Sequence, residues 1–168
     1  MKSNFYAKNM KILRKRMPVL EKALDMSRGS DFEYIVEPAK NGAMTLAIKH
    51  EDKVYQIHSR YDPQREAQQQ VLGKKLVNPK ILVILGLGLG YHVQACLEEL
   101  KNENLFLVVI EKDVEAFRVA MQNVDMSEML NSEKIRWVIG VPEHEGYAVL
   151  HDMVKQAGIT MQLFLKTL

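Results

Sequence analysis

The sequence from residue 80 to residue 92 reads Lys80-Ile-Leu-Val-Ile-Leu-Gly86-Leu-Gly88-Leu-Gly90-Tyr91-His92. Its first part, residues 81–85, is an unbroken run of branched aliphatic side chains. Such a run indicates a strand buried on both faces, because a half-exposed strand alternates apolar and polar residues. Three glycines at alternate positions follow, and an amphipathic segment then predicts a helix over residues 91–100. This order places backbone N–H groups at a helix N-terminus, where they can face an anionic or nucleotide ligand.

The length and composition leave room for one sizeable domain or two small ones. The chain has 168 residues, of which 47% are apolar and 26% charged, enough for a core and an ordinary aqueous surface. No apolar run approaches the roughly 20 residues that cross a bilayer, and no secretion signal is recognisable. We therefore expect a cytoplasmic protein without a membrane partner.

The single cysteine, Cys96, fits a reducing compartment and is expected to be a packed thiol inside a helix.

Positive charge is concentrated at the N-terminus. Residues 1–28 contain eight Lys or Arg against two acidic residues, a net charge of +6, so the rest of the chain carries −4 of the overall +2. The small overall charge argues against a general nucleic-acid binder, and no nucleic-acid partner is expected. The basic segment, with Lys11, Arg14, Lys15 and Arg16, is either a solvated helix face or a docking surface for an acidic partner.

Helix and strand patterns precede the glycine loop. An apolar stripe at helical spacing covers the N-terminal segment, and Pro18 is expected to produce a kink or two consecutive helices. The stripe consists of Tyr6, Met10, Leu13, Met17, Leu20 and Leu24. Three short strands, over residues 32–37, 43–49 and 54–59, are joined by hairpin turns and predict an antiparallel meander. Asp62 is then placed to cap a helix that begins at Pro63 and ends near Leu72.

Strand and helix patterns alternate after the glycine loop. Strands are predicted over residues 105–110, 135–139 and 161–165, and helices over 114–123 and 144–157, with an extra turn over 127–130. Repeats of this kind predict a right-handed parallel sheet. We place the boundary near residues 74–79, which gives modules of residues 1–77 and 78–168. Because a doubly wound sheet usually has about five to seven strands, we expect a fragment of a longer protein.

The glycine loop departs from two well-known nucleotide-binding patterns. In G-x-G-x-x-G the last glycine would fall on Tyr91 or Val93, and the P-loop would need Gly-Lys-Ser/Thr. What remains is G-x-G-x-G followed by Glu111 at the end of the next predicted strand, where a carboxylate can accept hydrogen bonds from a ribose diol. This pattern is typical of class I S-adenosylmethionine methyltransferases and equally of other nucleotide-binding folds. A tight turn beside a solvated glutamate is the structural alternative.

Two segments together resemble a known family. The first is His58-Ser59-Arg60-Tyr61-Asp62-Pro63-Gln64-Arg65-Glu66-Ala67, and the second is Leu85-Gly-Leu-Gly-Leu-Gly-Tyr-His92. In this order they resemble the motility accessory factor family of bacterial flagellin glycosyltransferases, over nearly the whole chain. The resemblance implies the N-terminal domain plus the first part of a central Rossmann-like domain. The expected fold class is therefore α/β, a small N-terminal helix plus antiparallel β-meander module followed by a partial Rossmann-like parallel sheet with flanking helices.

The same resemblance implies a reaction and a site. The donor would be a CMP-activated nonulosonic acid, the acceptor Ser or Thr of flagellin, and no separate cofactor is needed. The implied ligand-binding residues are Gly86, Leu87, Gly88, Leu89, Gly90, Tyr91, His92 and Glu111. Among them His92 is the candidate catalytic residue, as a phosphate contact or general base, with a helix-terminus hydrogen bond as its alternative role. The motif at the module junction comprises Ser59, Tyr61, Asp62, Arg65 and Glu66, which either contact the ligand or fix the junction.

Two other functions stay open at this point. One is an S-adenosylmethionine-dependent methyltransferase-type domain, and the other is a non-enzymatic interaction module that uses the basic N-terminal helix. The other histidines show neither HxH nor HExxH spacing, so no metal site is expected. A sheet that ends early exposes apolar surface, which favours a homo-oligomer.

Overall fold

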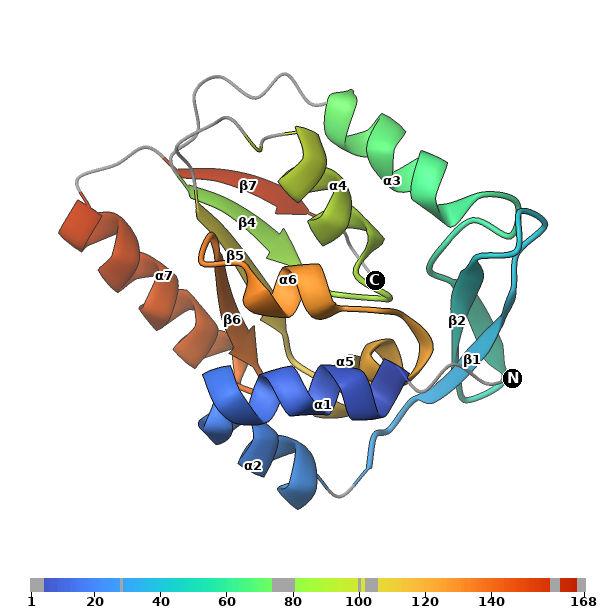
Figure 1. Ribbon diagram of the computed structural model, residues 1–168, viewed down its shortest axis with the longest axis horizontal. Coiled ribbons are helices and arrows are strands. Elements are labelled where there is room, and N and C mark those ends of the chain that lie inside the picture. Colours follow the sequence, from blue (N-terminus) through green and yellow to red (C-terminus); the bar gives the residue numbers. More distant parts are fainter. Residues whose placement is uncertain are drawn as a thin grey trace.

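The computed structural model describes residues 5–27, 29–73, 81–99, 101, 106–157 and 161–165. They form a three-stranded antiparallel sheet and a four-stranded parallel sheet with helices around them (Figure 1). The expected mixed α/β fold is confirmed. The predicted module boundary at residues 77 and 78, Lys80, and the predicted element ends at Leu100 and Leu105 lie outside the described residues.

The N-terminal segment forms two consecutive helices, α1 (Phe5–Arg16) and α2 (Pro18–Met26). The break falls at Pro18, as predicted, because proline fits the first turn of a helix but not its interior. The buried members of the apolar stripe are Met10, Leu13 and Leu24, which join the main hydrophobic core. The stripe therefore packs into the body of the protein.

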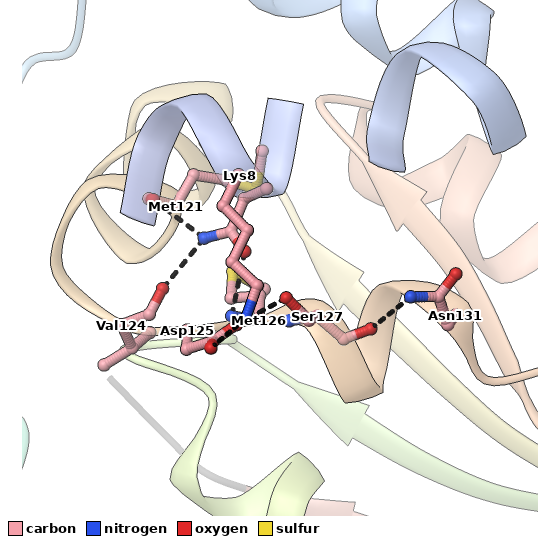
Figure 2. A network of polar contacts seen from close by, with 8 residues as sticks. Lys8, Met121, Val124, Asp125, Met126, Ser127 and Asn131 are labelled. Atoms are coloured by element: carbon pink, nitrogen blue, oxygen red, sulfur yellow. Dashed lines mark hydrogen bonds and ion pairs between the residues drawn. The ribbon is translucent and has the colours of Figure 1, made fainter. Parts of the chain in front are cut away.

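A buried asparagine fixes α1 against α5 (Val114–Asn123) and α6 (Ser127–Asn131). Asn9 Nδ2 donates to the carbonyls of Met121 and Val124, at 2.9 and 2.8 Å. Asn9 Oδ1 accepts the N–H of Met126 at 3.0 Å. Figure 2 shows this network around the turn between α5 and α6. One side chain thus provides hydrogen bonds to three backbone groups, at the end of α5 and in the turn before α6, that have no partner within these helices.

The antiparallel sheet, here sheet A, consists of β1 (Glu33–Pro38), β2 (Met44–His50) and β3 (Lys53–Gln56) in chain order. The prediction that the third strand runs to residue 59 is wrong at its end. Ile57 and His58 both donate their N–H groups to the Leu46 carbonyl, at 2.9 and 3.2 Å. Two residues against one partner residue break the ladder as in a β-bulge, and the chain leaves the sheet.

The parallel sheet, here sheet B, has the order β6-β5-β4-β7. Its strands are β4 (Ile81–Leu85), β5 (Phe106–Glu111), β6 (Ile135–Ile139) and β7 (Met161–Leu165). Each neighbouring pair is parallel, as the strand–helix alternation predicts. The remaining helices are α3 (Pro63–Leu72), α4 (Tyr91–Glu99) and α7 (Glu143–Ala157). This is the strand order of the first part of a doubly wound sheet.

Strand β4 is the centre of the packing. Leu82 and Ile84 face the main core, and Ile81 and Val83 face a second cluster on the opposite side of the sheet. The prediction of a strand buried on both faces is confirmed. The main core also includes Leu46 of sheet A, so the two sheets share apolar packing. The carboxyl end of β4 points toward sheet A (Figure 1).

Two further sequence predictions concern the helices. Cys96 of α4 is fully buried in the main core, and burial raises the pKa of its thiol to about 12. The predicted packed thiol is therefore confirmed. No helix within the described ranges is long and apolar enough to span a membrane.

Candidate functional site

The glycine loop between β4 and α4 adopts the backbone that its glycines allow. Gly86, Gly88 and Gly90 have φ values of 81°, 55° and 83°, in the left-handed region that L side chains rarely occupy. Gly88 meets a second constraint, because an added Cβ would lie 2.5 Å from His58 Nε2. The strand, glycine turn and helix predicted from the sequence are present. The loop is also in direct contact with the segment that leaves sheet A.

Glu111, the last residue of β5, ties the loop to the start of α5. The residue is 4% exposed. Oε2 accepts the N–H of Leu87 and Oε1 accepts the N–H of Asp113, both at 2.9 Å. Burial raises the pKa of Glu111, while these amide donors act in the opposite direction. The ribose contact remains a prediction, but Glu111 already has a structural role.

His58 holds the loop from the other side. The residue is 1% exposed, and its Nε2 accepts the N–H of Leu89 at 2.8 Å. The ring also lies edge-on to Tyr91, with centroids 5.1 Å apart. Because Nε2 accepts, the ring proton is on Nδ1. The sequence patterns predict no role for His58, although the residue opens the motif that ends at Ala67.

His92 lies against α3. Its Nε2 is 2.6 Å from Oε1 of Gln70, and the ring is buried. Its ring also stacks near that of His58, with centroids 6.2 Å apart. This arrangement corresponds to the alternative of a hydrogen bond near the helix start. A phosphate contact or general-base role for His92 remains a prediction.

Tyr91 crosses from α4 to sheet A. Its hydroxyl donates to the Met44 carbonyl at 2.7 Å, and burial raises the pKa of the phenol to about 12. The other members of the predicted ligand-binding loop, Leu87 and Leu89, are buried in the main core. These three side chains therefore anchor the loop to the protein.

The motif at the module junction shapes the start of α3. Asp62 Oδ1 accepts the N–H of Arg65 at 2.9 Å, which is the predicted helix cap. Glu66 Oε2 accepts the N–H of Ser59 at 2.9 Å, and Ser59 Oγ accepts the N–H of Tyr61 at 3.1 Å. These contacts are local and favour the structural interpretation of the motif. A ligand contact by the exposed Tyr61 or Arg65 remains a prediction.

A cavity of about 700 Å³ lies between sheet A and the carboxyl ends of β4 and β5. It is bounded by the loop before β1, one face of sheet A, the glycine loop and the start of α5. The described lining residues are Gly29, Ser30, Asp31, Phe32, Tyr34, Leu46, Ile48, His50, Tyr55, Ile57, Gly88, Glu111, Lys112, Asp113 and Ala116. Of the ligand-binding residues predicted from the sequence, this lining contains Gly88 and Glu111.

Asp113 organises the polar end of the cavity. Its Oδ1 accepts the N–H of Glu115 at 2.8 Å, which caps α5. Its Oδ2 accepts the hydroxyl of Tyr34 at 2.5 Å and also the hydroxyl of Ser30. Burial and the neighbouring carboxylate raise the pKa of Tyr34, so the phenol stays a donor at neutral pH. These contacts join the first strand of sheet A to the start of α5.

Among the described residues, no group of three or more His, Cys, Asp or Glu side chains is placed to hold a metal ion. What the cavity offers to a ligand is a set of hydrogen-bonding groups together with apolar contacts. Its position at the carboxyl ends of parallel strands is that of ligand sites in doubly wound proteins.

Comparison with known proteins identifies the family. The family model described as the glycosyltransferase Maf N-terminal domain matches residues 27–161, which include sheet A and strands β4, β5 and β6 of sheet B. The chain belongs to the Maf glycosyltransferase family, of which it represents the N-terminal domain. No curated protein sequence matches the chain. Among solved structures, the crystal structure of MNMC2 from Aquifex aeolicus matches at 16% identity and a TM-score of 0.40, covering 87% of this chain and 58% of that one.

Proposed function

We propose that this chain is the N-terminal part of a cytoplasmic glycosyltransferase that takes a CMP-activated nonulosonic acid as donor and glycosylates Ser or Thr of flagellin. Family membership supports the glycosyltransferase class. The observation that carries the donor assignment is the cavity at the ends of β4 and β5, whose lining includes both Gly88 and Glu111. A backbone amide beside a buried carboxylate suits the nucleoside part of an activated sugar.

His92 has a defined place in this proposal. It is our candidate for proton transfer to or from the reacting groups, but Gln70 occupies its Nε2 in the present arrangement. Proton transfer through Nε2 of His92 therefore requires the contact between α3 and α4 to open. Donor binding in the cavity has no such requirement, so binding and transfer are separable by experiment.

Donor binding is tested by calorimetry with CMP and a CMP-nonulosonic acid, on this chain and on a full-length parent protein. We expect the parent to bind both ligands. The Glu111→Gln variant should weaken binding about tenfold or more, since a hydrogen bond to a charged group contributes about 1.5–3 kcal/mol. Glu128→Gln, an exposed position on α6, is the matched control. A parent that binds neither ligand would refute the donor assignment.

The acceptor is tested separately. Flagellin incubated with the parent protein and the donor should gain the mass of the sugar on Ser or Thr, as measured by mass spectrometry of its peptides. Flagellin without the donor is the control. An unmodified flagellin in the presence of a donor that binds would contradict the acceptor assignment alone.

A methyltransferase-type function is the second candidate, favoured by the charges around the cavity. Three carboxylates, from Asp31, Glu111 and Asp113, line it together with Lys112. Such an environment suits the positive sulfonium of S-adenosylmethionine. Saturable S-adenosylmethionine binding that Glu111→Gln abolishes would favour this candidate. A calorimetric titration with S-adenosylmethionine that gives no heat of binding would contradict it.

A further inference from the structure

The glycine loop has few free donors for a phosphate. The N–H of Leu87 is bonded to Glu111, and the N–H of Leu89 is bonded to His58. The N–H groups of Gly86 and Gly90 are bonded to the carbonyls of Ile110 and Leu87, at 2.8 and 2.9 Å. In a phosphate-binding loop these amides would face the ligand instead. Within the described residues, the N–H of Gly88 is the loop amide without a protein partner.

The charges around the cavity also oppose an anion. The acidic residues of the described lining are Asp31, Glu111 and Asp113, and the basic ones are Lys112 and His50. Glu111 is almost fully buried and cannot turn away, because both of its oxygens are held by backbone amides. An incoming phosphate would bring negative charge close to the buried carboxylate of Glu111, which is unfavourable in a medium of low dielectric constant.

The same carboxylates suit a ligand that brings hydroxyl groups. A carboxylate offers about four acceptor positions. Glu111 uses two for Leu87 and Asp113, and Asp113 uses three for Glu115, Tyr34 and Ser30. Acceptor capacity remains on both side chains, and the existing bonds fix their orientation. A ribose diol supplies the donors that such a site lacks.

The opposite wall of the cavity comes from sheet A and is largely apolar. Leu46 and Ile48 of β2 and Ile57 just after β3 line it, as does the half-exposed Tyr55 of β3. Ala116 of α5 also lines the cavity, with a small side chain. A volume of about 700 Å³ falls in the range of small-molecule sites, which are mostly apolar with a few placed polar groups. This wall fits the flat ring of a base.

We propose that this cavity binds the nucleoside half of the donor as an uncharged unit, with the ribose hydroxyls on Glu111 and Asp113, the base against sheet A, and the phosphate outside. The identification of the nucleoside as cytidine rests on the proposed function. Sheet A is then part of the ligand site. The phosphate and sugar are held by groups other than the glycine loop.

The test is calorimetry of this chain with cytidine, CMP, adenosine and inorganic phosphate. We expect cytidine to bind within about threefold of CMP, a difference under 1 kcal/mol, and phosphate neither to bind nor to compete. Ala116→Leu should weaken cytidine binding at least about tenfold by filling the cavity. Ala148→Leu, the same change at an exposed position of α7, should leave it unaltered.

A measurement without substitutions covers the case in which Ala116→Leu unfolds the chain. Cytidine should shift the amide resonances of Gly88 and Asp113 in a nitrogen–proton correlation spectrum, and leave that of the exposed Gly42 in place. Phosphate that competes with cytidine, CMP that binds more than about a hundredfold tighter, or unshifted Gly88 and Asp113 signals would each overturn the inference.

The two proposals fail in different ways. A parent protein that binds the CMP-sugar while neither it nor this chain binds cytidine overturns the nucleoside cavity and leaves the proposed function standing. If this chain binds cytidine but the parent protein does not bind the CMP-sugar, the proposed function fails and the nucleoside cavity stands. Binding of adenosine in preference to cytidine overturns the cytidine assignment and supports the methyltransferase candidate.

Discussion

His58 accepts a hydrogen bond from the backbone N–H of Leu89 at 2.8 Å, so a side chain that has just left the antiparallel sheet holds the glycine loop of the parallel sheet. Both groups are buried. The contact joins residues 31 positions apart in the sequence. It makes the loop part of a rigid junction instead of an open anion site.

Removing the His58 ring should destabilise the protein. His58→Ala leaves the N–H of Leu89 without an acceptor and opens a cavity, and an unsatisfied buried amide alone costs about 1–3 kcal/mol. We expect the free energy of unfolding in urea to fall by about 2–4 kcal/mol. His50→Ala, at an exposed position, is the control. Equal stability of the two variants would mean that the His58–Leu89 bond contributes nothing.

Gly88 should tolerate alanine less well than another glycine of positive φ. Gly42 has a φ of 86° with no atom within 4 Å of an added Cβ, whereas at Gly88 the Cβ would meet His58. Gly42→Ala therefore measures backbone strain alone, about 1 kcal/mol. Gly88→Ala adds the steric clash and should cost at least about 1 kcal/mol more.

A double variant isolates the clash at Gly88. In the His58→Ala background the added Cβ has room, so the two substitutions should not add. The measurement is the free energy of urea unfolding for both single variants and the pair. Strict additivity would show that the conformation of Gly88 alone, and not its approach to His58, requires glycine.

The local parts of this architecture were predictable from sequence, and the junction was not. The aliphatic run of β4, the break at Pro18 and the cap at Asp62 depend on neighbours along the chain, so patterns of a few residues suffice. The turn of His58 out of sheet A depends on the carbonyl of Leu46 in β2, which is distant in the sequence. The apolar wall of Leu46 and Ile48 likewise looked like ordinary strand core until sheet A was placed over the glycine loop.

Asn9 should be among the most sensitive polar residues of the N-terminal helix. Asn9→Leu removes the partner of three backbone groups near Met121, Val124 and Met126 (Figure 2). We expect a loss of about 3 kcal/mol, because buried amides and carbonyls then lack hydrogen bonds. Asn131→Leu, which removes an exposed bond to the Ser127 carbonyl, should change the unfolding free energy by less than about 1 kcal/mol. Similar losses at the two positions would contradict a docking role for Asn9.

Cys96 supplies a prediction about pH. Burial raises the pKa of its thiol to about 12, against about 8.5 for an exposed thiol. The native state therefore disfavours the thiolate, and the stability that this thiol contributes is present below about pH 8.5 and declines as pH rises toward 12.

At pH 8 a thiol reagent should modify Cys96 only after the chain unfolds, since the thiolate is the reactive form. The measurement is the rate of modification with and without urea, and the Cys96→Ala variant gives the background signal. Rapid labelling of the folded protein would show that α4 opens to solvent and that the core around the glycine loop is not rigid.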